Sequence, residues 1–174
     1  MKREEAILAG GCFWCMQPVF DQLEGVLETS VGFCGGHVEH PSYERVCGGA
    51  TGHREVIDII FDADQISYRD ILNAFWRSID PTQADGQFAD RGEHYKTAIF
   101  YLNDVQKVEA EESKRALMEA GKFDLPVVTE ILPATSFFTA EVGHQKYYEK
   151  NAIHYGLYAE GSGRKPFLRK TWGE

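Results

Sequence analysis

The fold is decided by residues 5–15, which read Glu-Ala-Ile-Leu-Ala-Gly-Gly-Cys-Phe-Trp-Cys. The first five residues predict a short buried strand, the two glycines a tight turn, and the residues after them the entrance to a helix. Cys12 and Cys15 thus form a Cys-x-x-Cys pair where a strand passes into a helix. Because Pro18 fits a helix only near its first turn, we expect the regular helix to begin around Cys15 or later.

The apolar pattern on either side of this stretch predicts an α+β fold. Ser67 and Asp70 form a variant capping box for a helix that ends before Pro81. The glycine-rich stretch 32–52 and the polar stretch 80–94 predict loops. We expect a two-layer sandwich of helices on a mixed sheet, with a ferredoxin-like split-βαβ core, a long irregular C-terminal tail, and one domain over residues 1–174. The other expected elements are strands at 26–32, 55–61, 95–102 and 127–132, and helices at 19–23, 104–120 and 140–150.

The charge composition and the N-terminal sequence argue against some classes of binding partner. The chain has 174 residues, with 27 acidic against 18 basic side chains and a net charge of −9. Nucleic-acid binding depends on concentrated positive charge, so we expect no nucleic-acid partner. The N-terminal apolar run is too short and too acidic for a signal peptide or a membrane span. We therefore expect a cytoplasmic protein that does not bind membranes.

All four cysteines lie within the first 47 residues. Such a cluster in a reducing compartment indicates redox chemistry, a metal site, or buried small side chains. A thiol at a helix N-terminus has its thiolate favoured, which makes Cys12 a candidate nucleophile that could form a disulfide with Cys15. Alternatively, the Cys-x-x-Cys pair could form half of a zinc site. Cys34 and Cys47 do not form a second Cys-x-x-Cys pair, so a loop histidine would be needed to complete that site.

Several further motifs carry a resemblance to a known family. The sequence resembles peptide methionine sulfoxide reductase A, and the match spans roughly residues 5–150 with the motifs in the family's order. The matching segments are Gly11-Cys12-Phe13-Trp14-Cys15, Gly32-Phe33-Cys34-Gly35-Gly36, Pro41-Ser42-Tyr43, Thr51-Gly52-His53-Arg54-Glu55, Asp80-Pro81-Thr82, Asp90-Arg91-Gly92 with Tyr95, and Gly143-His144-Gln145.

The resemblance implies a reaction and a partner. The family reduces the S epimer of methionine sulfoxide, free or in proteins, through a cysteine sulfenic acid, and usually takes electrons from thioredoxin. It implies no cofactor and no metal. We expect a monomer.

The resemblance also implies roles for individual side chains. Cys12 matches the attacking thiol and Glu55 matches the acid that protonates the sulfoxide oxygen, a role that suits a partly buried carboxyl with a raised pKa. Tyr43 and Tyr95 match the tyrosines that hydrogen-bond that oxygen.

The substrate pocket is implied in the same way. Phe13 and Trp14 match the aromatic walls that receive the substrate methyl group, and Asp90 matches a position beside the oxygen-binding site. For His53 and His144 we expect packing or loop-ordering roles.

This sequence departs from the family pattern in its tail. Many members carry recycling cysteines there, whereas this tail has none. We favour Cys15 as the thiol that resolves the sulfenic acid, because it replaces a common glycine and a subclass with this form uses it. Cys47 is the second choice and Cys34 the third. Phe33 stands where a tyrosine is usual.

Two other functions remain open at this point. A thioredoxin-like dithiol oxidoreductase would need only the Cys-x-x-Cys pair and would give Glu55 and the two tyrosines no role. A zinc-stabilised interaction module would hold one zinc per chain.

Overall fold

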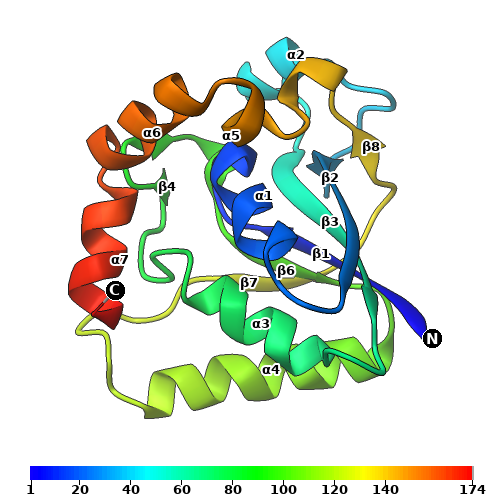
Figure 1. Cartoon of the computed structure of the whole chain (residues 1–174), viewed down its shortest axis with the longest axis vertical. Helices are drawn as coiled ribbons and strands as arrows, with labels where there is room; N and C mark the ends of the chain where they lie inside the picture. The colour runs from blue at the N-terminus through cyan, green and yellow to red at the C-terminus, as the bar shows by residue number, and fades with distance from the viewer. Residues whose placement is uncertain (174) are drawn as a thin grey trace.

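A six-stranded mixed sheet organises the molecule, in a computed structural model that describes residues 1–173 (Figure 1). The strand order is β7-β6-β1-β3-β2-β8, with every neighbouring pair antiparallel except β6 and β7. The four strands β6-β1-β3-β2 reproduce the expected split-βαβ core. The strands span Arg3–Ala9 (β1), Val26–Cys34 (β2), Arg54–Asp62 (β3), Ala98–Tyr101 (β6), Glu130–Pro133 (β7) and Phe138–Thr139 (β8).

Three helices cover one face of this sheet: α1 (Phe13–Asp21), α3 (Tyr68–Trp76) and α4 (Asp104–Glu119) (Figure 1). The main core lies between them and the sheet, where Leu8, Ile57 and Ile59 meet the apolar side of α3. The expected capping box at Ser67 is present, since its hydroxyl accepts from the Asp70 N–H and the Asp70 carboxylate accepts from the Ser67 N–H. The expected α+β fold is confirmed.

Helix α1 begins earlier than expected. It starts at Phe13 with Cys12 as its N-cap residue, and it contains Pro18. The helix continues through the proline, and contacts with other elements hold its start and its middle. At its start the Phe13 N–H donates to Glu55, and farther along Gln17 contacts Thr29 and the backbone of Lys146. Tertiary contacts override the local signal here.

The expectation of an irregular C-terminal tail was wrong. Residues after Asn151 form two helices, α6 (Ala152–Gly161) and α7 (Arg164–Trp172). Their sequences show little periodicity because their order depends on a few polar anchors rather than on a broad apolar face. Tyr158 donates to the Asp90 carboxylate, and the buried Arg164 guanidinium donates to the Gly10 and Ser78 carbonyls at 2.9 and 2.7 Å.

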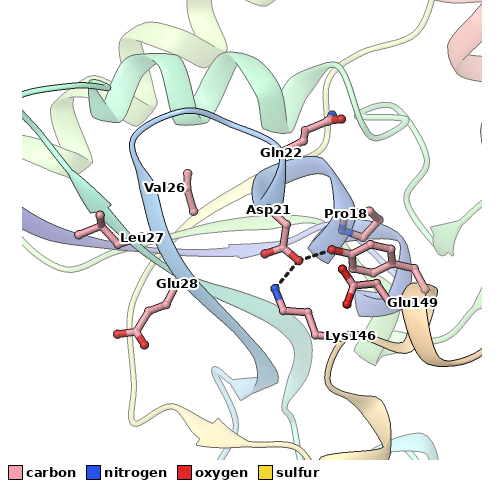
Figure 2. A pocket seen from close by; sticks show the side chains of 9 residues that line it. Pro18, Asp21, Gln22, Val26, Leu27, Glu28, Lys146 and Glu149 are labelled. Carbon is pink, nitrogen blue, oxygen red and sulfur yellow. Dashed lines mark hydrogen bonds and ion pairs between the residues drawn. The ribbon is translucent and has the colours of Figure 1, made fainter.

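The Asp21 carboxylate is one of the groups that tie the segment before these helices to α1. Asp21, at the end of α1, accepts from Lys146 Nζ and Tyr148 Oη, each at 2.5 Å, beside the pocket that Pro18 also lines (Figure 2). The expected helix at 140–150 is broken into a 3-10 turn, Val142–His144, and α5, Tyr147–Lys150. The break leaves His144 and Tyr147 beside Trp14, at the start of α1.

The expected loops contain short elements that matter for the site. Helix α2 (Tyr43–Cys47) lies within the glycine-rich stretch, and the polar stretch contains strands β4 (Gly86–Gln87) and β5 (Asp90–Arg91), followed by the 3-10 turn η1 (Glu93–Tyr95). Within residues 1–173, no helix has the length and apolar character needed to cross a membrane.

Candidate active site

The Cys12 thiol lies at the junction of β1 and α1, directly after two glycines that form a tightly packed turn. Gly11 has φ +86°, and a Cβ there would lie 2.6 Å from the side chain of Gln87 and 2.9 Å from the Arg164 guanidinium. A side chain would therefore displace the groups that surround the turn. Cys12 is only 5% exposed, and Cys15, one turn later, is 3% exposed.

Glu55 is the most strongly constrained acid of the site. It is 0% exposed on β3, and its Oε1 accepts from the Phe13 N–H at 3.1 Å. Its Oε2 has no hydrogen-bond partner among residues 1–173. Burial raises the pKa of the Glu55 carboxyl to about 8, against the opposing effect of the Phe13 N–H. The carboxyl is thus protonated near neutrality, as the sequence predicts, and one of its oxygens is available to a ligand.

The two thiols of the Cys-x-x-Cys pair differ in their electrostatics. Burial raises the pKa of the Cys12 thiol well above its usual range, and the Cys15 and Glu55 groups raise it further. For Cys15, the hydrogen bond with Cys12 outweighs burial, and the Arg164 charge and a hydrogen bond with Tyr155 act in the same direction, so its pKa falls to about 7. The expectation that the helix N-terminus favours the Cys12 thiolate is thus wrong for the ligand-free site, because desolvation is the larger effect.

Tyr43 and Tyr95 approach the same place from α2 and η1. Burial raises the pKa of both phenols, and the charges of Glu55 and Cys12 raise them further. Both hydroxyls therefore remain neutral donors beside Glu55 and Cys12.

Phe13 and Trp14 occupy different environments. The Phe13 ring is fully buried and packs on Phe33 and Tyr43, with ring centroids 5.8 and 6.0 Å apart. Trp14 is only partly buried and stacks on Tyr147 at 3.9 Å, so it is the more accessible aromatic surface.

The two histidines make ordering contacts of the expected kind. His144 Nδ1 accepts from Trp14 Nε1 at 3.1 Å, and its ring lies 4.3 Å from that of Tyr43. The His53 ring joins two parts of the glycine-rich loop, since one nitrogen accepts from the Gly36 N–H and the other lies 2.6 Å from the Val38 carbonyl.

Asp90, on β5, connects the site to the C-terminal helices. Burial raises the pKa of its carboxyl, while the Arg164 guanidinium acts to lower it. Its charge also acts on Glu55 and on both thiols of the pair. Its direct partner is Tyr158 on α6.

The other two cysteines lie in contrasting positions. The Cys47 thiol lies at the end of α2. Its Sγ is no more than 4.8 Å from a carboxylate oxygen of Glu55, and the thiol hydrogen-bonds with Tyr43. Cys34 neighbours Phe33 on β2, and neighbouring side chains of a strand face opposite sides of the sheet. Phe33 packs on Phe13, whereas Cys34 is buried on the other face, where its Sγ contacts Thr135. This placement separates Cys34 from Cys12.

Three residues near the site were missed by the sequence reasoning: Tyr155, Arg164 and His94. The first two lie in the tail, where no motif marked them, and they act on Cys15 through the fold. A buried cation so close to a pair of thiols is visible only in three dimensions. His94 directly precedes Tyr95 in η1 and carries no motif of its own.

The chain is similar to known proteins over nearly its whole length. The family model for peptide methionine sulfoxide reductase matches residues 4–174. Proteins called peptide methionine sulfoxide reductase MsrA from Bacillus licheniformis and Bacillus subtilis are each 52% identical over 172 residues, covering 99% of this chain and 95% and 97% of their own.

A solved structure gives the same answer for the fold. Mxr1 from Saccharomyces cerevisiae in reduced form has a TM-score of 0.82 and 30% sequence identity, with 87% of each chain covered. The family suggested by the sequence motifs is confirmed: this chain belongs to the peptide methionine sulfoxide reductase A family and is an enzyme that reduces methionine sulfoxide with thiols.

Proposed function

We propose that this chain reduces the S epimer of methionine sulfoxide, in proteins and free, with Cys12 as the nucleophile and Glu55 as the proton donor. The observation that carries the proposal is the fully buried Glu55 carboxyl, protonated near neutrality and with one oxygen unpartnered, beside Cys12. A sulfoxide oxygen leaves sulfur only when it is protonated, so the reaction needs such an acid.

In the first step the Cys12 sulfur attacks the sulfoxide while Glu55 gives its proton to the oxygen. Tyr43 and Tyr95 donate hydrogen bonds to that oxygen as its charge changes. The Cys12 sulfur bonds to the sulfoxide sulfur, and the hydroxyl formed there then moves to the Cys12 sulfur as the S–S bond and the substrate S–O bond break. Methionine leaves and Cys12 becomes the sulfenic acid. The proton lost by the Cys12 thiol balances the one that Glu55 gave up. We assign the substrate methyl group to Trp14 and Phe13, and a position beside the oxygen-binding groups to Asp90, whose hydrogen-bond partner is Tyr158.

In the second step Cys15 resolves the sulfenic acid. An attacking thiol works best with a pKa near the ambient pH, and the pKa of Cys15 is about 7. Its sulfur bonds to the Cys12 sulfur, and the sulfenic hydroxyl leaves as water with one proton. Cys47 is the alternative partner, since its thiol lies by Glu55. Cys34 is the weakest of the three because it faces the other side of the sheet.

Thioredoxin then returns two electrons to the disulfide. Yeast Mxr1 has been solved in complex with Trx2. The resolving thiol lies in the first turn of α1, so in this chain recycling needs no cysteine from the tail. We place the enzyme in the cytoplasm, because four free cysteines and a dithiol donor require a reducing compartment.

The dithiol-exchange alternative leaves the site unexplained. It would use Cys12 and Cys15 but give no role to a protonated, buried Glu55 flanked by two neutral phenols. The zinc-stabilised module is disfavoured as well, since neither thiol of the Cys-x-x-Cys pair belongs to the one potential metal cluster within residues 1–173.

The proposed activity predicts stereospecific turnover. With dithiothreitol as the reductant, the protein should convert the S epimer of a blocked methionine sulfoxide and leave the R epimer unchanged, as measured by chromatography. Equal conversion of both epimers would contradict the proposed selectivity for the S epimer. Reduction of insulin disulfides without sulfoxide reduction would favour dithiol exchange.

Glu55→Gln should slow reduction of the S epimer by roughly 10²–10⁴-fold, because the amide keeps an acceptor for the Phe13 N–H but cannot supply a proton. In the parent protein the rate should fall above about pH 8 as Glu55 ionises. An undiminished rate in the variant would remove Glu55 from the chemistry.

The same variant should change the pH dependence of stability. Since folding raises the pKa of Glu55, the unfolded chain loses this proton at lower pH than the folded one, and stability falls by up to about 1.4 kcal/mol per pH unit between the two pKa values. The melting temperature of Glu55→Gln relative to that of the parent should therefore increase as the pH rises from 4 to 8. A constant difference across this range would contradict the raised pKa.

Substitutions of Cys12 and Cys15 should have different effects on turnover. Cys12→Ser should abolish sulfoxide reduction, whereas Cys15→Ser should still release one methionine per chain and then stop when thioredoxin is the reductant. Rapid-quench assays with one equivalent of substrate distinguish the two. Unchanged thioredoxin-driven cycling in Cys15→Ser would transfer the resolving role to Cys47, and Cys34→Ser serves as the matched control.

A further inference from the structure

Three side chains from separate elements place metal-binding atoms together at the edge of the active site. They are Cys47 at the end of α2, Glu55 on β3 and His94 in η1, and their ligand atoms all lie within 4.8 Å of one another. No other group of three or more cysteine, histidine or acidic side chains within residues 1–173 meets this condition. The proposed reaction uses only Glu55 of the three.

The spacing and the ligand types fit zinc. Zinc bonds of 2.0–2.3 Å in a tetrahedral arrangement place the ligand atoms about 3.3–3.8 Å apart, so these atoms would need to approach by about 1 Å. Thiolate, imidazole and carboxylate are its usual ligands, and three protein ligands leave the fourth position to solvent. Cys47 lies on the surface and is followed by two glycines, which lets the thiol adjust and gives an ion access.

One of the three ligands has a fully buried atom that the fold, over residues 1–173, leaves without a partner. Glu55 Oε2 is buried without a hydrogen-bond partner, while Oε1 is held by the Phe13 N–H. The His94 side chain contributes its imidazole from η1, where its ring packs on the Tyr95 ring with the centroids 3.9 Å apart, and within the described part of the chain no hydrogen bond holds its nitrogens. Buried polar atoms are normally paired, so an unpaired oxygen on a buried carboxylate that meets a thiol and an imidazole within 4.8 Å points to a ligand.

We propose that Cys47, Glu55 and His94 bind one Zn²⁺ ion and that this ion and sulfoxide reduction exclude each other. Binding depends only on the three ligands. Exclusion rests in addition on the proposed role of Glu55, because a carboxylate bound to zinc carries no proton for the substrate oxygen. The ion would also pull the Cys47 thiol away from Tyr43, one of the two phenols that face the substrate. The site is then a reversible zinc-operated brake on the enzyme.

The competing location for zinc is the Cys-x-x-Cys pair, so the test removes that pair first. Reduced protein carrying Cys12→Ser and Cys15→Ser is titrated with zinc against a chromophoric zinc indicator in thiol-free buffer. We expect one zinc per chain. Adding Cys47→Ser or His94→Gln should weaken binding by more than about 100-fold, since losing a ligand should exceed the 10–100-fold effect of losing an outer-shell partner. Adding Cys34→Ser, which removes a thiol on the other face of the sheet, should leave binding unchanged.

Cobalt(II) provides an independent view of the same ligands. In the double-serine background it should produce a thiolate-to-cobalt charge-transfer band, and Cys47→Ser should remove that band. Absence of zinc binding in this background, or binding that survives both Cys47→Ser and His94→Gln, would overturn the proposed site whether or not the enzyme reduces sulfoxides.

The exclusion is tested with the native thiols in place. Pre-reduced protein without added thiol is given one equivalent of the S epimer, with and without zinc, and the methionine released is measured. Zinc should slow this single turnover in the parent and in Cys34→Ser, and should do so much less in His94→Gln, each protein being compared with its own zinc-free rate. Equal slowing in His94→Gln would assign the inhibition to the Cys-x-x-Cys pair and overturn the brake.

Discussion

The active site depends on the burial of the Glu55 carboxyl, of which only one oxygen has a hydrogen-bond partner among residues 1–173. Glu55 pairs in register with Phe33 on the neighbouring strand and accepts the first N–H of α1, so the sheet and the helix together fix one oxygen and leave the other free. Desolvation then keeps the carboxyl protonated near neutral pH. A structural protein would gain stability by replacing this group with an apolar side chain, whereas an enzyme that must protonate a sulfoxide requires it.

The Cys12 and Cys15 thiols, both buried, differ in pKa. In the buried pair, negative charge is favoured on Cys15, through its hydrogen bond with Cys12, the Arg164 guanidinium and Tyr155. The C-terminal helices therefore contribute to the chemistry although they carry no cysteine: they bring a buried cation beside the thiol proposed to resolve the sulfenic acid. Arg164 also donates to the Gly10 carbonyl in the turn before Cys12, so one side chain both shapes the turn and adjusts the charge next to it.

The parts of this structure that could be predicted from sequence are those with a local cause. Alternating and helical apolar spacing predicted the core strands and the helices α3 and α4, the Ser67 capping box was confirmed, and the motifs identified the family. Helices α6 and α7 were missed because their anchors, Asp90 and Gly10, lie far away in the chain. The raised pKa of the Cys12 thiol was not predicted, because its position at the start of a helix is visible in the sequence and its burial is not. The meeting of Cys47, Glu55 and His94 depends on three separate elements, and no spacing rule could have found it.

The most direct test of this account is the protonation state of Glu55 itself. Infrared difference spectra of the parent against Glu55→Gln, recorded across a pH series, would isolate the carbonyl band of the protonated carboxyl. This band should be present at pH 6.5 and should disappear with a midpoint near pH 8. A Glu55 carboxylate already ionised at pH 6.5 would contradict the account, since the site would then hold no acid for the sulfoxide oxygen.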